Sequence, residues 1–154
     1  MAKNRIGLAA LSMLVAITVS SARAGEKAPL VTVYKNQYCG CCKGWIKHLQ
    51  EAGFTVDVKD VDDVTPVKKN ASVPEKLRSC HTAQVGKYVV EGHVPASVVK
   101  RLLAERPRVL GIAVAGMPVG SPGMEGANPE RYQVMAFKAD GSSTVYATIE
   151  PTKN

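Results

Sequence analysis

The sequence predicts an α/β domain, because segments typical of strands alternate with segments of helical periodicity. Residues 30–34 are β-branched and apolar, as in a buried strand, and residues 55–59 alternate between apolar and polar side chains. Between them, residues 42–52 carry apolar side chains at i, i+3, i+4 and i+7, the spacing of one helix face, and Gly53 ends the helix. Two parallel strands joined by this helix form a βαβ unit, whose crossover is right-handed. The apolar face consists of Cys42, Trp45, Ile46 and Leu49.

The middle of the chain is less regular. Residues 61–78 are polar, and we expect only a short helix there, starting at Pro74. A loop at 79–82 and a short strand at 87–90 follow. Residues 96–105 are expected to form a helix, because four apolar side chains lie at helical spacing and a proline stops the pattern.

The last third of the chain is predicted to be extended. Residues 109–115 form an apolar strand-like run, and residues 119–131 form a loop rich in glycine and proline. Strands are expected at 132–138 and 144–149. The four residues between them, 139–142, contain an Asp-Gly pair, which is typical of a hairpin turn.

This order of elements, with cysteines directly after the first strand, resembles the thioredoxin fold. The resemblance implies a thioredoxin-like α/β fold with an insertion between the second strand and the second helix, over residues 61–94. It also implies a cis-proline that faces the cysteine turn. Pro118 stands where that proline is expected, preceded by Met117.

The first residues are expected to direct export. Lys3 and Arg5 precede an apolar run at residues 6–19, and a small-residue cleavage site follows. The sequence therefore predicts a cleavable signal peptide over residues 1–24, an exported domain over residues 25–154, and no membrane association after cleavage.

The net charge of +7 includes three basic residues of the expected signal peptide. Lys3, Arg5 and Arg23 leave with it, and the charge falls to +4. The remaining basic residues are scattered among acidic ones, without a basic stripe interleaved with aromatic residues. This pattern argues against nucleic acid as a partner.

Three of the four cysteines, Cys39, Cys41 and Cys42, fall within four residues at the expected strand-to-helix turn. A helix N-terminus lowers the pKa of a thiol, because its free N–H groups and dipole favour the thiolate. Structural disulfides stabilise mainly by closing long loops, and bridges within this cluster would close almost nothing. The cluster is therefore interpreted as chemical rather than structural.

Three interpretations of the cluster remain open. Soft thiolates select Cu(I), zinc or iron–sulfur centres, and crowded cysteines suit sulfurs that bridge several metal ions. Alternatively, Cys39 and Cys42 form the dithiol pair of a thiol–disulfide oxidoreductase, with Cys41 as a bystander. The third interpretation is a small binding module stapled by disulfides or zinc, which would unfold when reduced or stripped of metal.

Further donors are expected from distant parts of the chain. Cys80 is either a fourth thiolate or the partner of a disulfide that holds the insertion. His93 and its alternative His81 would either ligate a metal or orient a cysteine. Met117 offers a soft thioether, although methionine also fills gaps in cores. Met124 is a weaker candidate, in a glycine- and proline-rich loop.

The remaining residues of these types have simpler interpretations. His48 is expected on the surface of the first helix, about 9 to 10 Å from the cysteines at 1.5 Å per residue. Met135 lies within an expected strand and is interpreted as a core residue. Trp45 is expected to pack beneath the cysteine turn.

Four separated motifs resemble the CopG family of periplasmic copper-resistance proteins. These motifs are Tyr38-Cys39-Gly40-Cys41-Cys42, Cys80-His81-Thr82-Ala83, residues 90–95 and residues 116–125. The resemblance implies a multinuclear Cu(I) site bridged by cysteines, interconversion of copper oxidation states, and other periplasmic copper-resistance proteins as partners. The expected metal ligands are Cys39, Cys41, Cys42, Cys80, His93 and Met117.

Overall fold

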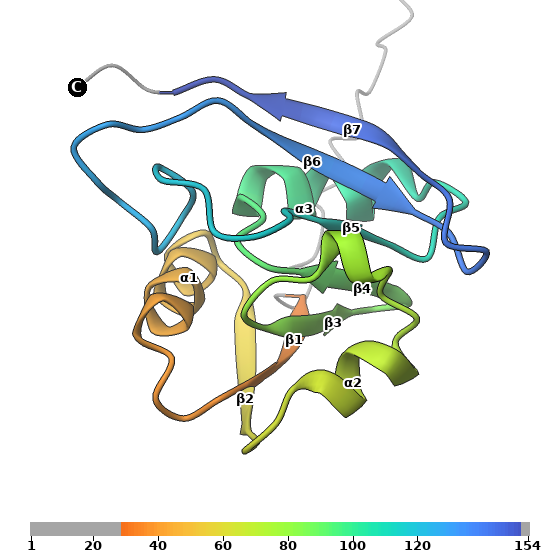
Figure 1. Cartoon of the computed structure of the whole chain (residues 1–154), viewed down its shortest axis with the longest axis horizontal. Helices are drawn as coiled ribbons and strands as arrows, with labels where there is room; N and C mark the ends of the chain where they lie inside the picture. Colours follow the sequence, from red (N-terminus) through yellow and green to blue (C-terminus); the bar gives the residue numbers. More distant parts are fainter. Residues whose placement is uncertain (1–28, 152–154) are drawn as a thin grey trace, which may run out of the picture.

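The computed structural model describes residues 29–151, so the expected signal peptide lies outside the described residues. A mixed seven-stranded sheet runs in the order β2-β1-β3-β4-β5-β6-β7 (Figure 1). The predicted α/β class is confirmed. The elements are β1 Leu30–Lys35, α1 Gly40–Glu51, β2 Thr55–Asp60, α2 Thr65–Asn70, η1 Glu75–Leu77, β3 Thr82–Val85, β4 Tyr88–Glu91, α3 Ala96–Glu105, β5 Gly111–Ala113, β6 Tyr132–Phe137 and β7 Ser143–Ile149.

The predicted βαβ unit is present at the start of the sheet. Strands β1 and β2 pair in parallel, with Leu30 opposite Thr55, and α1 connects them. The four apolar side chains expected on one face of α1 are all buried. Among them, Trp45 is fully buried and its indole N–H donates to the Val94 carbonyl at 2.8 Å. Trp45 therefore packs beneath the cysteine turn, as predicted.

The segment expected as an insertion, residues 61–94, supplies the centre of the sheet. It contains α2, the short 3-10 helix η1, and the antiparallel hairpin of β3 and β4. Strand β3 pairs antiparallel with β1, so the loop before β3 ends beside the turn after β1. Both α2 and β3 were missed at the sequence level, where residues 79–82 were expected to be a loop. Cys80 and His81 lie in the part of that loop that precedes β3.

Two layers of core cover the two faces of the sheet. One core contains side chains from α1 and α3, among them Leu49 and Leu102. The smaller core lies on the other face and contains Leu77 of η1, together with Val89 and Phe137. Figure 1 shows α3 behind the sheet and α2 in front of it. None of the helices within residues 29–151 is long and apolar enough to span a membrane.

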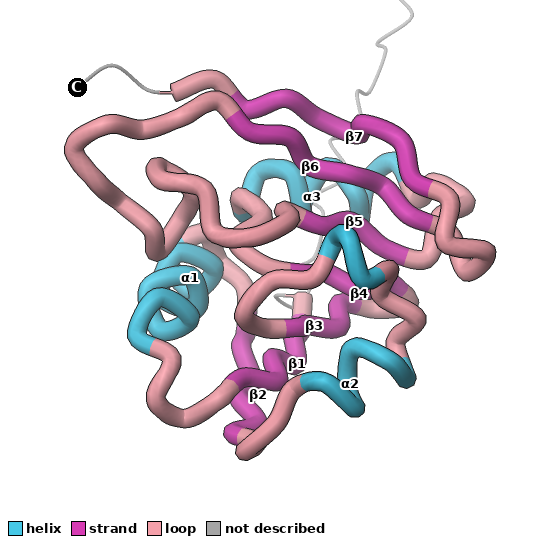
Figure 2. Tube along the Cα trace, in the orientation of Figure 1, coloured by secondary structure: helices cyan, strands magenta, loops and turns pink. Residues whose placement is uncertain are grey.

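A long loop without regular structure joins β5 to β6 (Figure 2). The expected cis-proline in this loop is wrong: the bond between Met117 and Pro118 is trans, and the described chain contains no cis peptide bond. The loop instead changes direction at Gly116, Gly120 and Gly123, whose φ angles are +66°, +91° and +83°. Glycine adopts such angles without steric cost, so these turns do not need a cis bond.

Candidate metal centre

The cysteine turn is built by the N-terminus of α1. Cys39 is the N-cap residue, and its sulfur accepts a hydrogen bond from the Cys42 backbone N–H at 3.4 Å. Cys41 lies in the first turn of the helix and is partly exposed, whereas Cys42 is fully buried on the core-facing side. The cap and the helical period thus fix three sulfurs in different surroundings within four residues.

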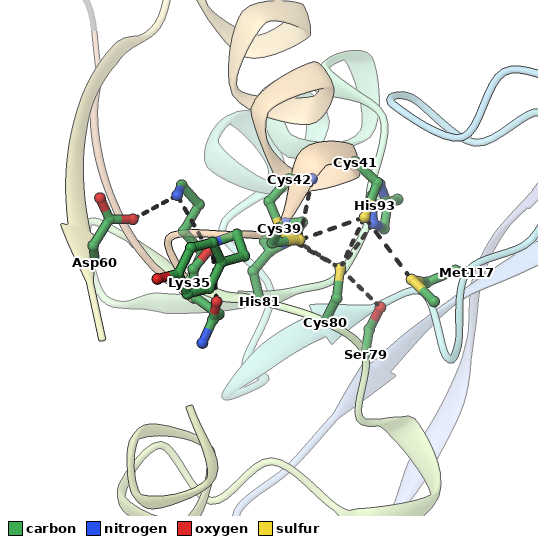
Figure 3. Close-up of a disulfide and its surroundings, with 12 residues drawn as sticks. Lys35, Cys39, Cys41, Cys42, Asp60, Ser79, Cys80, His81, His93 and Met117 are labelled. Atoms are coloured by element: carbon green, nitrogen blue, oxygen red, sulfur yellow. Dashed lines mark hydrogen bonds and ion pairs between the residues drawn. A yellow bond between two sulfur atoms is a disulfide. The ribbon is translucent and has the colours of Figure 1, made fainter. Parts of the chain in front are cut away.

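The four cysteine sulfurs converge, as Figure 3 shows, and all lie within 4.8 Å of one another. Cys39 and Cys42 are joined by a disulfide. The Cys41 sulfur lies 3.4 Å from that of Cys39 and 4.0 Å from that of Cys80. The Cys80 sulfur is 3.7 Å from that of Cys42, although the two residues are 38 positions apart in the chain. Cys80 therefore reaches the cluster from the start of β3, the strand next to β1, and it forms no disulfide.

His93 contacts the Cys80 sulfur through a defined ring nitrogen. Its Nδ1 atom lies 2.7 Å from the Pro122 carbonyl oxygen, which can only accept, so Nδ1 carries the proton of the neutral ring. The other nitrogen, Nε2, lies 2.9 Å from the Cys80 sulfur. Burial lowers the pKa of His93, partly opposed by the Pro122 carbonyl and the Glu125 carboxylate. His93 is therefore a neutral imidazole with a free lone pair directed at the cluster.

His81 lies equally deep and forms a second group of donors with Cys80 and His93. Its Nδ1 atom is 3.3 Å from the Cys80 sulfur, and its ring lies 4.3 Å from the Trp45 ring, centre to centre. Its Nε2 atom is buried without a hydrogen-bond partner among the described residues. Burial lowers the pKa of His81 well below its ordinary value, and the neighbouring His93 and Lys68 add to this effect. The sequence ranked His81 below His93, and only the structure places it against the same sulfur.

Burial raises the pKa of the Cys80 thiol to about 12, and the nearby Cys41 adds to the shift. Cys80 is therefore protonated at neutral pH in the metal-free protein. A metal that binds its sulfur must displace this proton, so Cys80 couples metal affinity to pH.

Met117 approaches the cluster from the long loop after β5. Its thioether sulfur lies 4.0 Å from the Cys41 sulfur, and the residue is 49% exposed. Met117 therefore lies at the solvent-facing side of the cluster, opposite the buried Cys42 (Figure 3). The expected position facing the cysteines is present, although the following peptide bond is trans.

The loop that carries Met117 packs against α1 at a contact between two glycines. A Cβ atom on Gly44 would fall 2.8 Å from the Gly123 Cα atom, and one on Gly123 would fall 2.4 Å from the Cys41 carbonyl oxygen. Neither position has room for a side chain. This close approach places the neighbouring Pro122 carbonyl where it binds His93.

Other candidate residues lie outside the cluster. His48 is only partly exposed, because its Nε2 atom accepts a hydrogen bond from the Ala96 N–H at the start of α3, at 3.0 Å. This role was missed when His48 was expected to be a simple surface residue. Among the described residues, the methionine sulfur in contact with the cluster is that of Met117, and not that of Met124. Met135 lies in β6, packed against the smaller core.

Comparison with known proteins adds independent information. A family model described as "Protein of unknown function, DUF411" matches residues 77–124, a range that contains Cys80, His93 and Met117. No curated protein matches the sequence. A solved structure named "Copper resistance protein copG- Form 2" is similar with 43% identity and a TM-score of 0.75, covering 79% of this chain and 98% of its own. A second, "Copper resistance protein copG- Form 1", gives the same identity and TM-score, with 81% and 99% covered.

Proposed function

Because the chain belongs to the CopG family of copper resistance proteins, we propose that it is a periplasmic protein that holds Cu(I) in a cysteine-bridged multinuclear cluster. The ligands in this proposal are Cys39, Cys41, Cys42 and Cys80, with His93 and Met117 completing the site. Copper is the protein's cargo, and its tight retention by sulfur would protect the exported compartment during copper stress.

One observation carries this proposal: four cysteine sulfurs lie within 4.8 Å of one another, and three of them come from four consecutive residues. Thiolates and thioethers are soft ligands that favour Cu(I). Structural zinc sites instead take their ligands from well-separated pairs in a tetrahedral arrangement. With Cys41 close to both Cys39 and Cys80, each sulfur has a neighbouring sulfur with which to share an ion. Shared ions favour a cluster over a single metal.

A redox role is the second part of the proposal. When reduced, Cys39 and Cys42 can give up two electrons and two protons and form the disulfide seen in the structure. Two Cu(II) ions take those electrons and become two Cu(I) ions, and water takes the two protons, so electrons and atoms balance. Anaerobic mixing of the reduced protein with Cu(II) should consume two thiols for every two Cu(I) ions formed. An unchanged thiol count would exclude this step and leave only copper storage.

The competing function is a thiol–disulfide oxidoreductase that uses Cys39 and Cys42. The disulfide between the N-cap and the first turn of α1 favours it, because helix N-termini activate thiols in such enzymes. Its test is the reduction of insulin. Activity that requires Cys39 and Cys42, but neither Cys41 nor Cys80, would replace copper binding as the main function.

Copper binding is tested by anaerobic competition of the reduced mature domain with a Cu(I) chelator. We expect the substitution of each cysteine by serine to weaken binding, because all four sulfurs belong to one group. Met117→Leu tests the thioether, and Met135→Leu is its matched control, because Met135 lies in β6 and packs against the smaller core. Intact copper binding in all four cysteine variants would contradict the proposal.

Export remains part of the proposal. We propose that residues 1–24 are removed and that residues 25–154 form the periplasmic protein. Mass determination of the protein recovered from a periplasmic extract tests both statements together. A mass that includes residues 1–24 would contradict them.

A further inference from the structure

Residues at the end of β4 make a series of contacts with the loop that carries Cys80. A Glu91 carboxylate oxygen accepts the Ser79 N–H at 2.6 Å. The Gly92 N–H donates to the His81 carbonyl at 3.1 Å. Between these two contacts, the His93 imidazole reaches the Cys80 sulfur at 2.9 Å. Three consecutive residues of one strand end therefore fix the residue before Cys80, the residue after it, and its sulfur.

The end of β4 and the loop that carries Cys80 lie too close together for a side chain at Gly92. Gly92 has a φ angle of +71°, and a Cβ atom there would lie 2.6 Å from both the Ser79 Cβ atom and the Val114 carbonyl oxygen. On its other side, the Ser79 hydroxyl donates to the Gly116 carbonyl. Ser79 is thus hydrogen-bonded both to the end of β4, through its N–H, and to the loop that carries Met117, through its hydroxyl.

Glu91 is itself held by a buried partner from α2, an element that offers no ligand to the cluster. The Lys68 ammonium lies 2.7 Å from the same Glu91 oxygen and 3.0 Å from the Thr82 hydroxyl. That hydroxyl donates to the second Glu91 oxygen at 2.7 Å. Glu91 is fully buried and Lys68 is 4% exposed, so water screens neither charge. Each group is compensated only by the polar atoms around it.

We propose that Lys68 and Glu91 are positioning residues for the metal site, acting on Cys80 through the Ser79 N–H. The proposal rests on the proposed copper function for its role in binding, but not for the contact itself. A cysteine at a loop tip has a mobile sulfur unless the backbone on both sides is fixed. Groups that fix ligands in this way are known to change metal affinity about 10- to 100-fold when removed. Lys68 fixes the orientation of the Glu91 carboxylate, and that carboxylate fixes the position of the backbone at Ser79, directly before Cys80.

The test must separate this contact from the buried charges. Glu91→Leu alone would leave the buried Lys68 ammonium without a charged partner, and the resulting loss of stability would obscure any change at Cys80. Two double variants avoid this problem, because both are neutral at these positions. Lys68→Met with Glu91→Gln keeps an amide oxygen for the Ser79 N–H. Lys68→Met with Glu91→Leu removes that acceptor and keeps a similar volume.

The first readout needs no copper. With the Cys39–Cys42 disulfide closed, Cys41 and Cys80 are the free thiols. Trypsin places them on separate peptides, so their alkylation rates can be measured together by mass spectrometry. We expect the Gln variant to keep the wild-type Cys80 rate and the Leu variant to raise it at least about tenfold, as a loosened loop exposes the sulfur. The Cys41 rate, the internal control, should stay constant.

The second readout is Cu(I) affinity, which should fall in the Leu variant and not in the Gln variant. Equal Cys80 rates in wild type and both variants would overturn the proposal. An equal rise in both variants would also overturn it, because the charge and not the contact with Ser79 would then matter. If no protein binds Cu(I) but the alkylation rates separate as expected, the copper function fails and the positioning of Cys80 stands.

Discussion

The Nε2 atom of His93 lies 2.9 Å from the sulfur of Cys80, while the Nδ1 atom of the same ring is bound to a backbone carbonyl. The carbonyl fixes the tautomer, and the free nitrogen is therefore directed at the cluster. In the disulfide state this contact is a hydrogen bond to a thiol. In the copper-loaded state, the same nitrogen can ligate a metal or orient the sulfur that does.

The first prediction concerns that nitrogen. His93→Phe keeps a buried ring but removes both nitrogens, so we expect Cu(I) affinity to fall about 10- to 100-fold. Chelator competition measures the change. His48→Gln is the control, since His48 contacts the start of α3 and not the cluster. Equal affinities for His93→Phe and wild type would remove His93 from the site.

The second prediction concerns the pH dependence of copper binding. Because the pKa of the Cys80 thiol is raised to about 12, copper must displace its proton at any pH near neutral. Affinity should therefore increase with pH, and Cys80 should contribute about one unit to the slope of log affinity against pH. Competition titrations at several pH values should show that Cys80→Ser lowers the slope by this amount. An unchanged slope would mean that the Cys80 sulfur is not a ligand.

The third prediction concerns the stability of the copper-free protein in acid. Burial holds the pKa of His81 well below 6.5, so the unfolded chain takes up a proton near pH 6.5 while the folded protein does not. The free energy of unfolding should therefore fall as the pH drops below that value, by about 1.4 kcal/mol per pH unit for this group.

Urea denaturation at a series of pH values measures this slope. His81→Phe should flatten this slope. Near pH 7 the variant loses the 3.3 Å contact between Nδ1 and the Cys80 sulfur, but the Nε2 atom that it also removes has no hydrogen-bond partner among the described residues. Part of the pH dependence should remain in this variant, because burial also lowers the pKa values of His48 and His93. A slope unaffected by His81→Phe would mean that His81 is protonated in the folded protein.

The fourth prediction uses two glycines of the same helix. Gly44→Ala places a methyl group 2.8 Å from the Gly123 Cα atom, and such overpacking typically costs about 1–3 kcal/mol. Gly40→Ala is the matched control, because its Cβ atom meets nothing within 4 Å. Alanine there should instead stabilise the helix by up to about 1 kcal/mol. Urea denaturation measures the free energy of unfolding of both variants. Equal changes would mean that the loop between β5 and β6 does not pack closely on α1.

The sequence was sufficient to predict the elements whose signals are local. The helical spacing from Cys42 to Leu49 and the Asp140-Gly141 turn each depend on neighbouring residues alone, and both are confirmed. Strand β3 was missed because it has four residues and follows directly on Cys80 and His81, where no periodicity can develop. Its place beside β1 comes from long-range pairing. Helix α2 was missed because residues 61–78 are polar, although its Pro66 lies in the first turn, where proline is favoured.

The candidate metal centre could likewise be predicted only in part from the sequence. The three crowded cysteines are visible in the sequence, but the arrival of Cys80 depends on how β3 pairs with β1. Lys68 and Glu91 were missed altogether, since a lysine in a polar segment gives no sign that it is buried. A glutamate that ends an apolar strand is the one signal that could have drawn attention to this pair.

The most direct test of the account is X-ray absorption at the copper edge on the reduced protein loaded anaerobically with Cu(I). We expect a first coordination shell dominated by sulfur, together with scattering from a second copper ion, and we expect Cys41→Ser to abolish the copper–copper signal. A shell of nitrogen and oxygen, or sulfur ligands without copper–copper scattering in the wild type, would contradict a cysteine-bridged cluster.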